Sequence, residues 1–445
     1  MKTNYSTRYA ASPQDVKNYD TTRIREEFLI DNLMKYDVIN LVYTHYDRFI
    51  AGSAVPTKSS LKLETLDALK SENFLDRREL GIINVGGKGT IKVGNKSYLN
   101  FSSNDYLGLN HHPDIYQALM EGTERFGTCA SGSSLLTGYS YAHQALENDI
   151  CAWLNKPKCL LFASGFSANN ALMHALGHKS CQLYLDKLSH ASLIDGALSS
   201  EAKVKRFLHN DTAQLQRLLA QNQQQNANQG QAVNPVIVSE GVFSMDGDQA
   251  HIAELAKIAQ QYQGLLYMDD AHSIGVVGEH GQGSSSIANI DVVMATCGKS
   301  IATSGAFVAC DETLADYLVN FSRHYIYSTA ISPAIAWATR KSIEIIQTQH
   351  WRREKIVELS QLLKSKLTSK AKLIKNASSI HAIVIGDETA TLKVCQKLRD
   401  MGIWLTAIRP PTVPSNSSRL RVTITSDHDI KDINYLANCI NEVID

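Results

Sequence analysis

The 445-residue chain has no net charge, no paired cysteine motif and no long hydrophobic run. Lysine plus arginine equals aspartate plus glutamate at 44 each, so the charge gives no indication that the protein binds nucleic acid or an anionic membrane. The eight cysteines lie scattered from Cys129 to Cys439 without a Cys-x-x-Cys pair, which argues against a zinc site or a disulfide framework. No apolar stretch approaches the roughly 20 residues of a membrane-spanning helix, and the first residues are polar. These absences predict a soluble cytoplasmic protein with no metal site.

Apolar, strand-like runs alternate with segments of helical period over most of the chain. The runs begin at Cys159, Cys181, Pro235, Leu265 and Asp291. This alternation predicts an α/β fold built on a mostly parallel, doubly wound sheet. Ligands bind such sheets at the carboxyl ends of the strands. We expect five polar segments to close strands at that edge, namely 164–166, Asp186, Glu240, Asp269 and Lys299.

Lys299 is the most informative residue, because Asp269 and His272 stand about thirty positions before it. A lysine held at a strand end and partly desolvated can offer a neutral amine for a Schiff base. A pyridoxal phosphate ring also needs a carboxylate beside its pyridine nitrogen, for which Asp269 is the candidate. Taken alone, Lys299 could be a surface lysine and Asp269 a helix cap. Taken together, the two residues predict a pyridoxal phosphate site.

Seven motifs, in order, connect the region from about residue 97 to the C-terminus with one enzyme family. They are Tyr98–Asn110, Gly138–Asn148, Leu161–Ala171, Lys187–Ile194, Glu240–Gln249, Asp269–Glu279 and Thr406–Ser415. With this set the chain resembles the 8-amino-7-oxononanoate synthases, which belong to the pyridoxal-phosphate α-oxoamine synthases. The resemblance implies the fold type I of pyridoxal-phosphate-dependent transferases, with a smaller C-terminal α/β domain.

The resemblance also implies how the cofactor is held. The implied cofactor-binding residues are Gly165, Phe166, His190, Ser244, Asp269, His272, Thr296 and Lys299. His190 would stack on the ring, and the backbone N–H groups of Gly165 and Phe166 would hold the phosphate at a helix N-terminus. Of these residues Lys299, His190 and Asp269 would take part in catalysis. His190 could instead cap a helix, and the hydroxyl groups of Ser244 and Thr296 could merely satisfy turns.

Two further residues are implied to bind the substrate. A guanidinium grips a carboxylate with two parallel hydrogen bonds, and Arg421 matches the carboxylate-binding arginine of the family. Arg419 competes with it, because residues two apart in a strand share a face. Asn104 would assist Arg421, although an asparagine before a turn would look the same. Ser328 and Thr329 match a stretch that reaches a neighbouring subunit, which implies a homodimer.

The implied reaction condenses L-alanine with pimeloyl-CoA or a pimeloyl-carrier protein, releasing carbon dioxide and the free thiol. The chain departs from the family pattern at Cys129 and Ala130, and again at Ser300, where glycine is usual. Both departures fall near the implied acyl channel, so they bear on acyl specificity. A sister enzyme that condenses glycine with acetyl-CoA is one alternative reading. A non-catalytic fusion is the other.

The first 96 residues do not follow this pattern. Segments 22–33, 40–52 and 75–93 resemble the N-terminal part of the 5-keto-4-deoxyuronate isomerases, which implies a β-rich, cupin-like segment. A cupin metal site needs several histidines, whereas this segment has only His45, so isomerase chemistry is not expected. The predicted domains are therefore 1–96, 97–335 and 336–445, with a seam near residues 94–96. We expect the polar tract 220–234 to form a surface loop.

Overall fold

The computed structural model describes residues 3–31, 33–45, 49–71, 73–75, 80–82, 91, 97–228 and 234–444. The chain divides into two compact units, Met1–Ile91 and Lys92–Asp445. The predicted seam near residues 94–96 lies outside the described residues. The predicted boundary at residue 96 remains a proposal.

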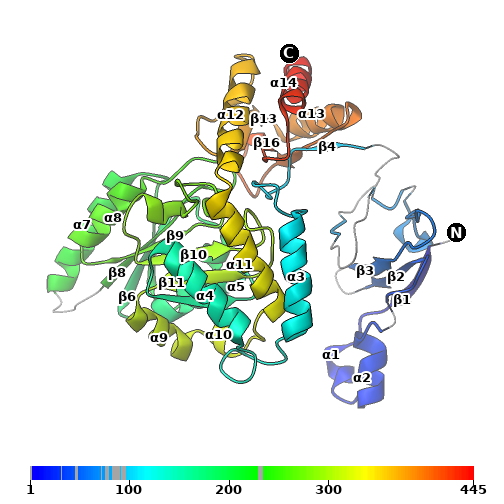
Figure 1. Cartoon of the computed structure of the whole chain (residues 1–445), viewed down its shortest axis with the longest axis horizontal. Coiled ribbons are helices and arrows are strands. Elements are labelled where there is room, and N and C mark those ends of the chain that lie inside the picture. The colour runs from blue at the N-terminus through cyan, green and yellow to red at the C-terminus, as the bar shows by residue number, and fades with distance from the viewer. Residues whose placement is uncertain are drawn as a thin grey trace. The chain divides into compact units, whose positions relative to one another are not determined.

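The N-terminal unit contains a small sheet in the order β1-β2-β3 (Figure 1, blue). Strand β1 runs parallel to β2, and β3 runs antiparallel to it. The elements are β1 (Asn4–Arg8), α1 (Pro13–Val16), α2 (Thr21–Phe28), β2 (Ile39–Thr44), β3 (Ile50–Ala54) and the 3-10 turn η1 (Asp67–Leu69). Its buried hydrophobic cluster comprises Ile39, Leu41, Leu66 and Phe74. The cupin-like character of this unit stays a prediction.

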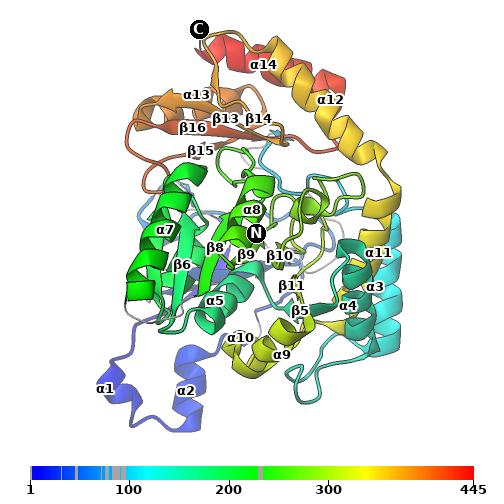
Figure 2. The ribbon, with the colours of Figure 1, turned by 90° about the vertical axis from the view of Figure 1, so that its left-hand side faces the viewer.

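The second unit is built on a seven-stranded sheet in the order β5-β11-β10-β9-β8-β6-β7 (Figure 2). Its strands are β5 (Lys158–Phe162), β6 (Cys181–Asp186), β7 (Lys203–Phe207), β8 (Asn234–Glu240), β9 (Leu265–Asp269), β10 (Val292–Thr296) and β11 (Ala306–Cys310). All neighbouring pairs are parallel except those that β11 makes with β10 and β5. The predicted mostly parallel, doubly wound sheet is therefore confirmed.

Successive residues of these strands point to opposite faces of the sheet, and helices cover both faces. Leu266, Met268 and Val293 belong to one buried cluster, whereas Tyr267 and Met294 belong to the other. Helices of the first face are α3 (Pro113–Phe126), α4 (Tyr141–Leu154), α7 (Thr212–Asn228), α8 (Ile252–Gln261) and α11 (Pro333–Thr348). Helices of the second face are α5 (Gly165–Leu176), α6 (Ala191–Leu198), α9 (Glu312–Phe321) and α10 (Arg323–Ile326). The 3-10 turn η2 spans Gly283–Ser286.

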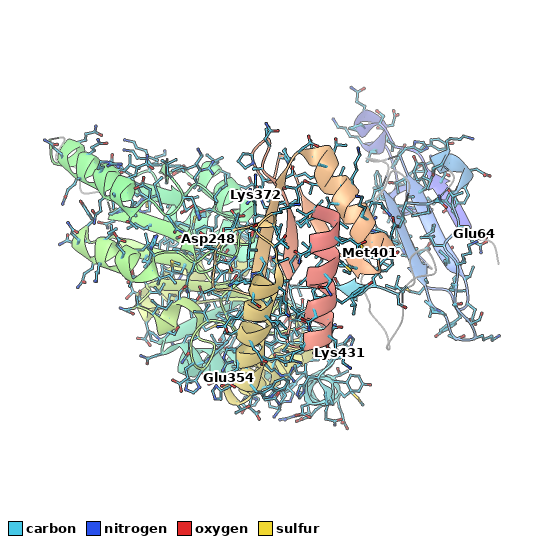
Figure 3. The ribbon with its side chains drawn as sticks, turned by 90° about the horizontal axis from the view of Figure 1, so that it is seen from above. Glu64, Asp248, Glu354, Lys372, Met401 and Lys431 are labelled. Atoms are coloured by element: carbon cyan, nitrogen blue, oxygen red, sulfur yellow. The ribbon has the colours of Figure 1, made fainter. Side chains whose placement is uncertain are left out.

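A smaller antiparallel sheet in the order β12-β13-β16-β15 forms the C-terminal layer, with three helices beside it (Figures 1 and 3). The elements are α12 (Trp351–Lys366), β12 (Lys372–Leu373), β13 (Ile380–Gly386), α13 (Glu388–Asp400), β14 (Ile403–Trp404), β15 (Thr406–Ile408), β16 (Ser418–Thr423) and α14 (Ile430–Ile444). Strand β4 (Leu99–Asn100) pairs with β14, and Phe101 is buried in this layer's core. Ala336 and Ile346 of α11, in contrast, lie in the core of the large sheet. The predicted start of the small domain at residue 336 remains a proposal.

The expectation of a loop over the polar tract 220–234 is wrong over its first part. Helix α7 continues to Asn228. Glutamine and alanine are good helix formers, and Asn222 turns inward, where it is buried and its side chain accepts a 2.6 Å hydrogen bond from the Lys205 amine. Residues 229–233 lie outside the described part of the chain.

Candidate active site

Lys299 lies at the carboxyl edge of the large sheet, three residues beyond the end of β10 at Thr296. The prediction that Lys299 itself closes the strand is therefore corrected, because a turn intervenes. Its amine Nζ is 2.7 Å from Nε2 of His272. Burial lowers the pKa of the Lys299 amine to about 8, against the opposing influence of the Asp269 and Glu240 carboxylates. A substantial fraction of the amine is therefore uncharged near neutral pH.

A chain of side chains leads from Lys299 to the small sheet. Nδ1 of His272 is 2.5 Å from the Tyr106 hydroxyl, which is 3.2 Å from Oδ1 of Asn104. Arg421 donates to the same Asn104 oxygen at 3.1 Å. Burial raises the pKa of Tyr106 to about 12 and holds the pKa of His272 well below its usual range. A neutral His272 that donates from Nδ1 to the Tyr106 hydroxyl and accepts from Lys299 at Nε2 is consistent with these contacts.

Asp269, the last residue of β9, is buried and held by two donors. Oδ2 accepts a 2.7 Å hydrogen bond from the Asn169 amide, and Oδ1 accepts one of 2.9 Å from the Ala271 N–H. The Tyr267 hydroxyl donates to the Asn169 oxygen at 2.5 Å, which fixes the direction of the amide. The carboxylate is therefore oriented in advance, as a partner for a pyridine nitrogen must be.

His190 is the N-cap residue of α6, so the capping role considered for it is realised. Its Nδ1 is 2.7 Å from Oγ of Ser192, which in turn accepts from Asn169 at 2.9 Å. Its backbone N–H donates to Oε1 of the buried Glu240 at 2.5 Å. These contacts join His190 to the Asp269 network. Stacking of its ring on a cofactor remains a proposal.

The expected phosphate site lies at the N-terminus of α5. Ser164 caps this helix by accepting from the Ser167 N–H at 3.1 Å. The first N–H groups of a helix have no partner within it, so Gly165 and Phe166 can offer theirs to an anion. A Cβ atom at Gly165 would stand only 3.4 Å from Cβ of Thr296, which shows that this helix start adjoins the end of β10. The hydroxyl of Thr296 donates to the Gly305 carbonyl at 3.2 Å.

The two arginines of β16 have different partners, although both point to the same face of the small sheet. Arg421 donates from Nε to the Ser244 carbonyl at 2.7 Å and reaches Asn104 with another nitrogen. Arg419 instead forms an ion pair with Asp246. The structure thus places Arg421 with Asn104 and Ser244, beside the chain that ends at Lys299. Direct contact of the Ser244 hydroxyl with a cofactor remains a proposal.

The sequence alone indicates no binding or catalytic role for three residues of the site. They are Tyr106, Asn169 and Glu240. Burial raises the pKa of Glu240 well above its usual range, and the nearby Asp269 adds to the effect. Its position at the end of β8 was a usable signal. No comparable signal marked Tyr106 and Asn169, because their partners lie 166 and 100 residues away in the chain.

The donor set fits pyridoxal phosphate. A half-buried lysine with a lowered pKa, an oriented buried carboxylate and a helix N-terminus lie along one edge of the sheet. Among the described residues, no group of three or more histidines, cysteines and acidic residues could hold a metal ion. None of the described helices is long and apolar enough to cross a membrane.

Comparison with known proteins yields one family and a consistent set of relatives. Residues 96–440 match the model of the family "Aminotransferase class I and II". An 8-amino-7-oxononanoate synthase of Photobacterium profundum is 44% identical over 340 residues, which cover 76% of this chain and 86% of the relative.

Solved structures agree with this family match. A serine palmitoyltransferase from S. paucimobilis with a bound PLP–myriocin aldimine superposes with a TM-score of 0.73 at 27% identity, covering 79% of this chain and 88% of the other. An 8-amino-7-oxononanoate synthase from Francisella tularensis gives a TM-score of 0.66 at 28% identity, covering 78% and 97%.

Proposed function

Because the chain belongs to the aminotransferase class I and II family, we propose that it is a pyridoxal-phosphate-dependent acyltransferase of biotin biosynthesis. Its proposed reaction joins L-alanine to a pimeloyl thioester and yields 8-amino-7-oxononanoate, carbon dioxide and a free thiol. The observation that carries the proposal is the half-buried amine of Lys299, 2.7 Å from His272 and on the same sheet edge as Asp269. The likeness to curated and solved 8-amino-7-oxononanoate synthases supports the choice of substrates.

When bound, pyridoxal phosphate supplies an electron sink for the carbon that loses its proton. Lys299 would hold the cofactor through its amine. Asp269 would keep the pyridine nitrogen protonated, and the N–H groups of Gly165 and Phe166, with Thr296, would hold the phosphate. His190 would cover the ring, and His272 and Ser244 would lie toward its phenolic oxygen.

The substrate would be bound from the side of the small sheet. Arg421 would grip the alanine carboxylate with its fork of N–H donors, and Asn104 would fix the guanidinium plane. The Lys299 amine, with its pKa of about 8, can take the α-proton at neutral pH and return it later. His272 keeps this amine in place while itself remaining neutral.

Three finer points belong to the same proposal. The acyl donor is pimeloyl-CoA or a pimeloyl-carrier protein. The working form is a homodimer, in which Ser328 and Thr329 reach the partner's cofactor phosphate. The compartment is the cytoplasm.

An absorbance titration with L-alanine tests the proposal. The purified protein should carry a yellow cofactor whose spectrum changes on adding L-alanine, and adding a pimeloyl thioester should then release 8-amino-7-oxononanoate and free thiol. A response to glycine and acetyl-CoA instead would assign the chain to the sister enzyme. A colourless protein that takes up no added pyridoxal phosphate would overturn the proposal and favour a non-catalytic fusion.

A further inference from the structure

His209 lies outside every motif considered above, yet two carboxylates hold it. It follows β7, and its Nδ1 is 3.0 Å from Oδ1 of Asp186, the last residue of β6. Its Nε2 is 2.7 Å from Oδ2 of Asp248. Its ring also stands edge-on against Phe243, with the ring centres 4.4 Å apart. His209 therefore joins the end of β6 to the segment that follows β8.

His209 is a cation in this position. Burial disfavours the charged ring, but the hydrogen bonds and charges of Asp186 and Asp248 outweigh burial and raise its pKa to about 10. Asn210 adds a 3.0 Å hydrogen bond to the same oxygen of Asp248. The link to Asp248 is thus a charge-assisted hydrogen bond with a further donor beside it, of the stronger kind found in proteins.

Asp248 closes a tight turn, residues 243–248. The Phe243 N–H donates to the Asp248 carbonyl at 2.9 Å, and the Gly247 N–H donates to the Phe243 carbonyl at 2.9 Å. Gly247 has a φ of +72°, and a Cβ atom there would stand 2.2 Å from the Ile380 carbonyl of β13. The turn is therefore pressed closely against the small sheet, and only glycine fits at this approach.

The far side of the 243–248 turn meets the arginines of β16. Asp246 pairs with Arg419, and its carbonyl accepts from the Asn376 amide at 2.7 Å. The Ser244 carbonyl accepts from Nε of Arg421 at 2.7 Å. The turn thus lies between His209 of the large domain and the arginine proposed to bind the substrate carboxylate. Figure 3 labels Asp248 in this region, between the large-domain helices and the C-terminal helices.

We propose that His209 is a positioning residue for amino-acid binding, acting through Asp248 and the 243–248 turn on the Ser244 carbonyl and hence on the direction of the Arg421 guanidinium. The inference rests on the proposed function for the identity of the substrate. An arginine fork must meet a carboxylate in one plane, so a displaced Ser244 carbonyl weakens binding even though Arg421 itself is intact.

The test compares four single variants and one double variant of His209 and Asp248 with the wild-type holoenzyme. His209→Ala and Asp248→Ala break the link from either side, and His209→Gln retains an N–H donor toward Asp248. Arg340→Ala is the matched control, because Arg340 forms an ion pair of similar exposure with Asp149, at 2.6 Å, between α11 and α4. The Kd for L-alanine is read from cofactor absorbance, and KM for alanine, KM for the acyl donor and kcat are measured alongside.

We expect His209→Ala and Asp248→Ala to raise the Kd and KM for L-alanine about tenfold, which corresponds to the weakening of about one hydrogen bond between Arg421 and the substrate. The KM for the acyl donor should stay unchanged, and His209→Gln should lose less. In the cofactor-free protein, hydrogen exchange at the Phe243 and Gly247 amides should be faster in His209→Ala than in Arg340→Ala. The double variant of His209 and Asp248 should lose no more than either single variant.

Unchanged alanine affinity in His209→Ala would overturn the proposal. So would an equal loss in Arg340→Ala, which would mark a general loss of stability. The failure of the proposed function looks different, since the wild type itself would then show no response to L-alanine. Should the wild type respond to another amino acid instead, the same variants are compared on that amino acid, and the role of His209 is decided there.

Discussion

The two units of the chain differ in how they bury hydrophobic residues. The second unit packs alternate residues of long strands into two large clusters, one on each face of its sheet. The first unit has one small buried cluster among its described residues, made of Ile39, Leu41, Leu66 and Phe74. A small cluster of this kind buries less apolar area, so it contributes less to the stability of its unit.

The family match begins near the residue at which the second compact unit begins. The family match begins at residue 96, and the second compact unit begins at Lys92. The predicted site residues all lie in the second unit, whereas His45 of the first contacts aromatic rings, stacking on Tyr9 at 4.7 Å. The site residues therefore lie in the unit that has the two large hydrophobic clusters. The predictions below test whether function follows the same division.

Loss of the Lys299 amine should have the largest effect. Lys299→Ala should reduce turnover by several orders of magnitude, because the residue would hold the cofactor and also carry the substrate proton. Borohydride reduction of the wild type should attach the cofactor covalently to Lys299, as read by peptide mass mapping. Label on another lysine, or turnover within tenfold of the wild type, would place the site elsewhere and break the comparison.

Asp269→Asn should have the next largest effect. It keeps the shape and the hydrogen bond from Asn169 but removes the charge needed beside the pyridine nitrogen. We expect kcat to fall roughly 100-fold or more, the scale for losing one group that stabilises charge in the transition state. The Kd for L-alanine should change much less. If kcat falls, the Kd for L-alanine rises by a similar factor and the unfolding midpoint drops, Asp269 has a structural role instead.

The sheet and the cofactor could be predicted from the sequence because each depends on local pattern. Strands such as Leu265–Asp269 alternate between two faces, and a lysine thirty positions after Asp269 is a specific combination. The fold class and the cofactor predicted on this basis, and the enzyme family predicted from the resemblance of seven motifs, are confirmed by the family match and the solved relatives.

Other parts of the site depend on contacts that no local pattern encodes. The chain from Lys299 through His272 to Tyr106 joins residues up to 166 positions apart. Alternation could not separate Arg419 from Arg421, since their partners distinguish them: Asp246 for Arg419, and Asn104 with the Ser244 carbonyl for Arg421. The polar tract after residue 220 was misjudged because a buried amide at Asn222 resembles a loop residue until its partner Lys205 is known.

Cofactor addition to the cofactor-free protein should depend on pH through Lys299. Its pKa is lowered to about 8, so the reactive neutral amine predominates above that pH and declines about tenfold per unit below it. The rate of cofactor uptake should therefore rise from pH 6.5 and level off above about 8. Stopped-flow absorbance measures this rate.

Two variants test this pH profile, because they should shift the pKa of Lys299 in opposite directions. Asp269 raises the pKa of Lys299 and Arg421 lowers it. Asp269→Asn should therefore move the midpoint to lower pH, and Arg421→Met should move it to higher pH. A midpoint that does not move in either variant would mean that another group limits uptake.

Removal of the N-terminal unit should have the smallest effect. A chain that starts at Val93 retains all of the second compact unit except Lys92, including the pairing of Leu99 with Ile403 that holds β4 in the C-terminal layer. We expect its cofactor content, alanine Kd and kcat to stay within about twofold of the full chain, because independent units contribute additively. Aggregation of the shortened chain while the full chain stays folded would show instead that the first unit covers apolar surface of the second.

The full chain should also leave a 5-keto-4-deoxyuronate unchanged with or without added metal. Metal-dependent isomerisation would overturn the argument from the single histidine, His45.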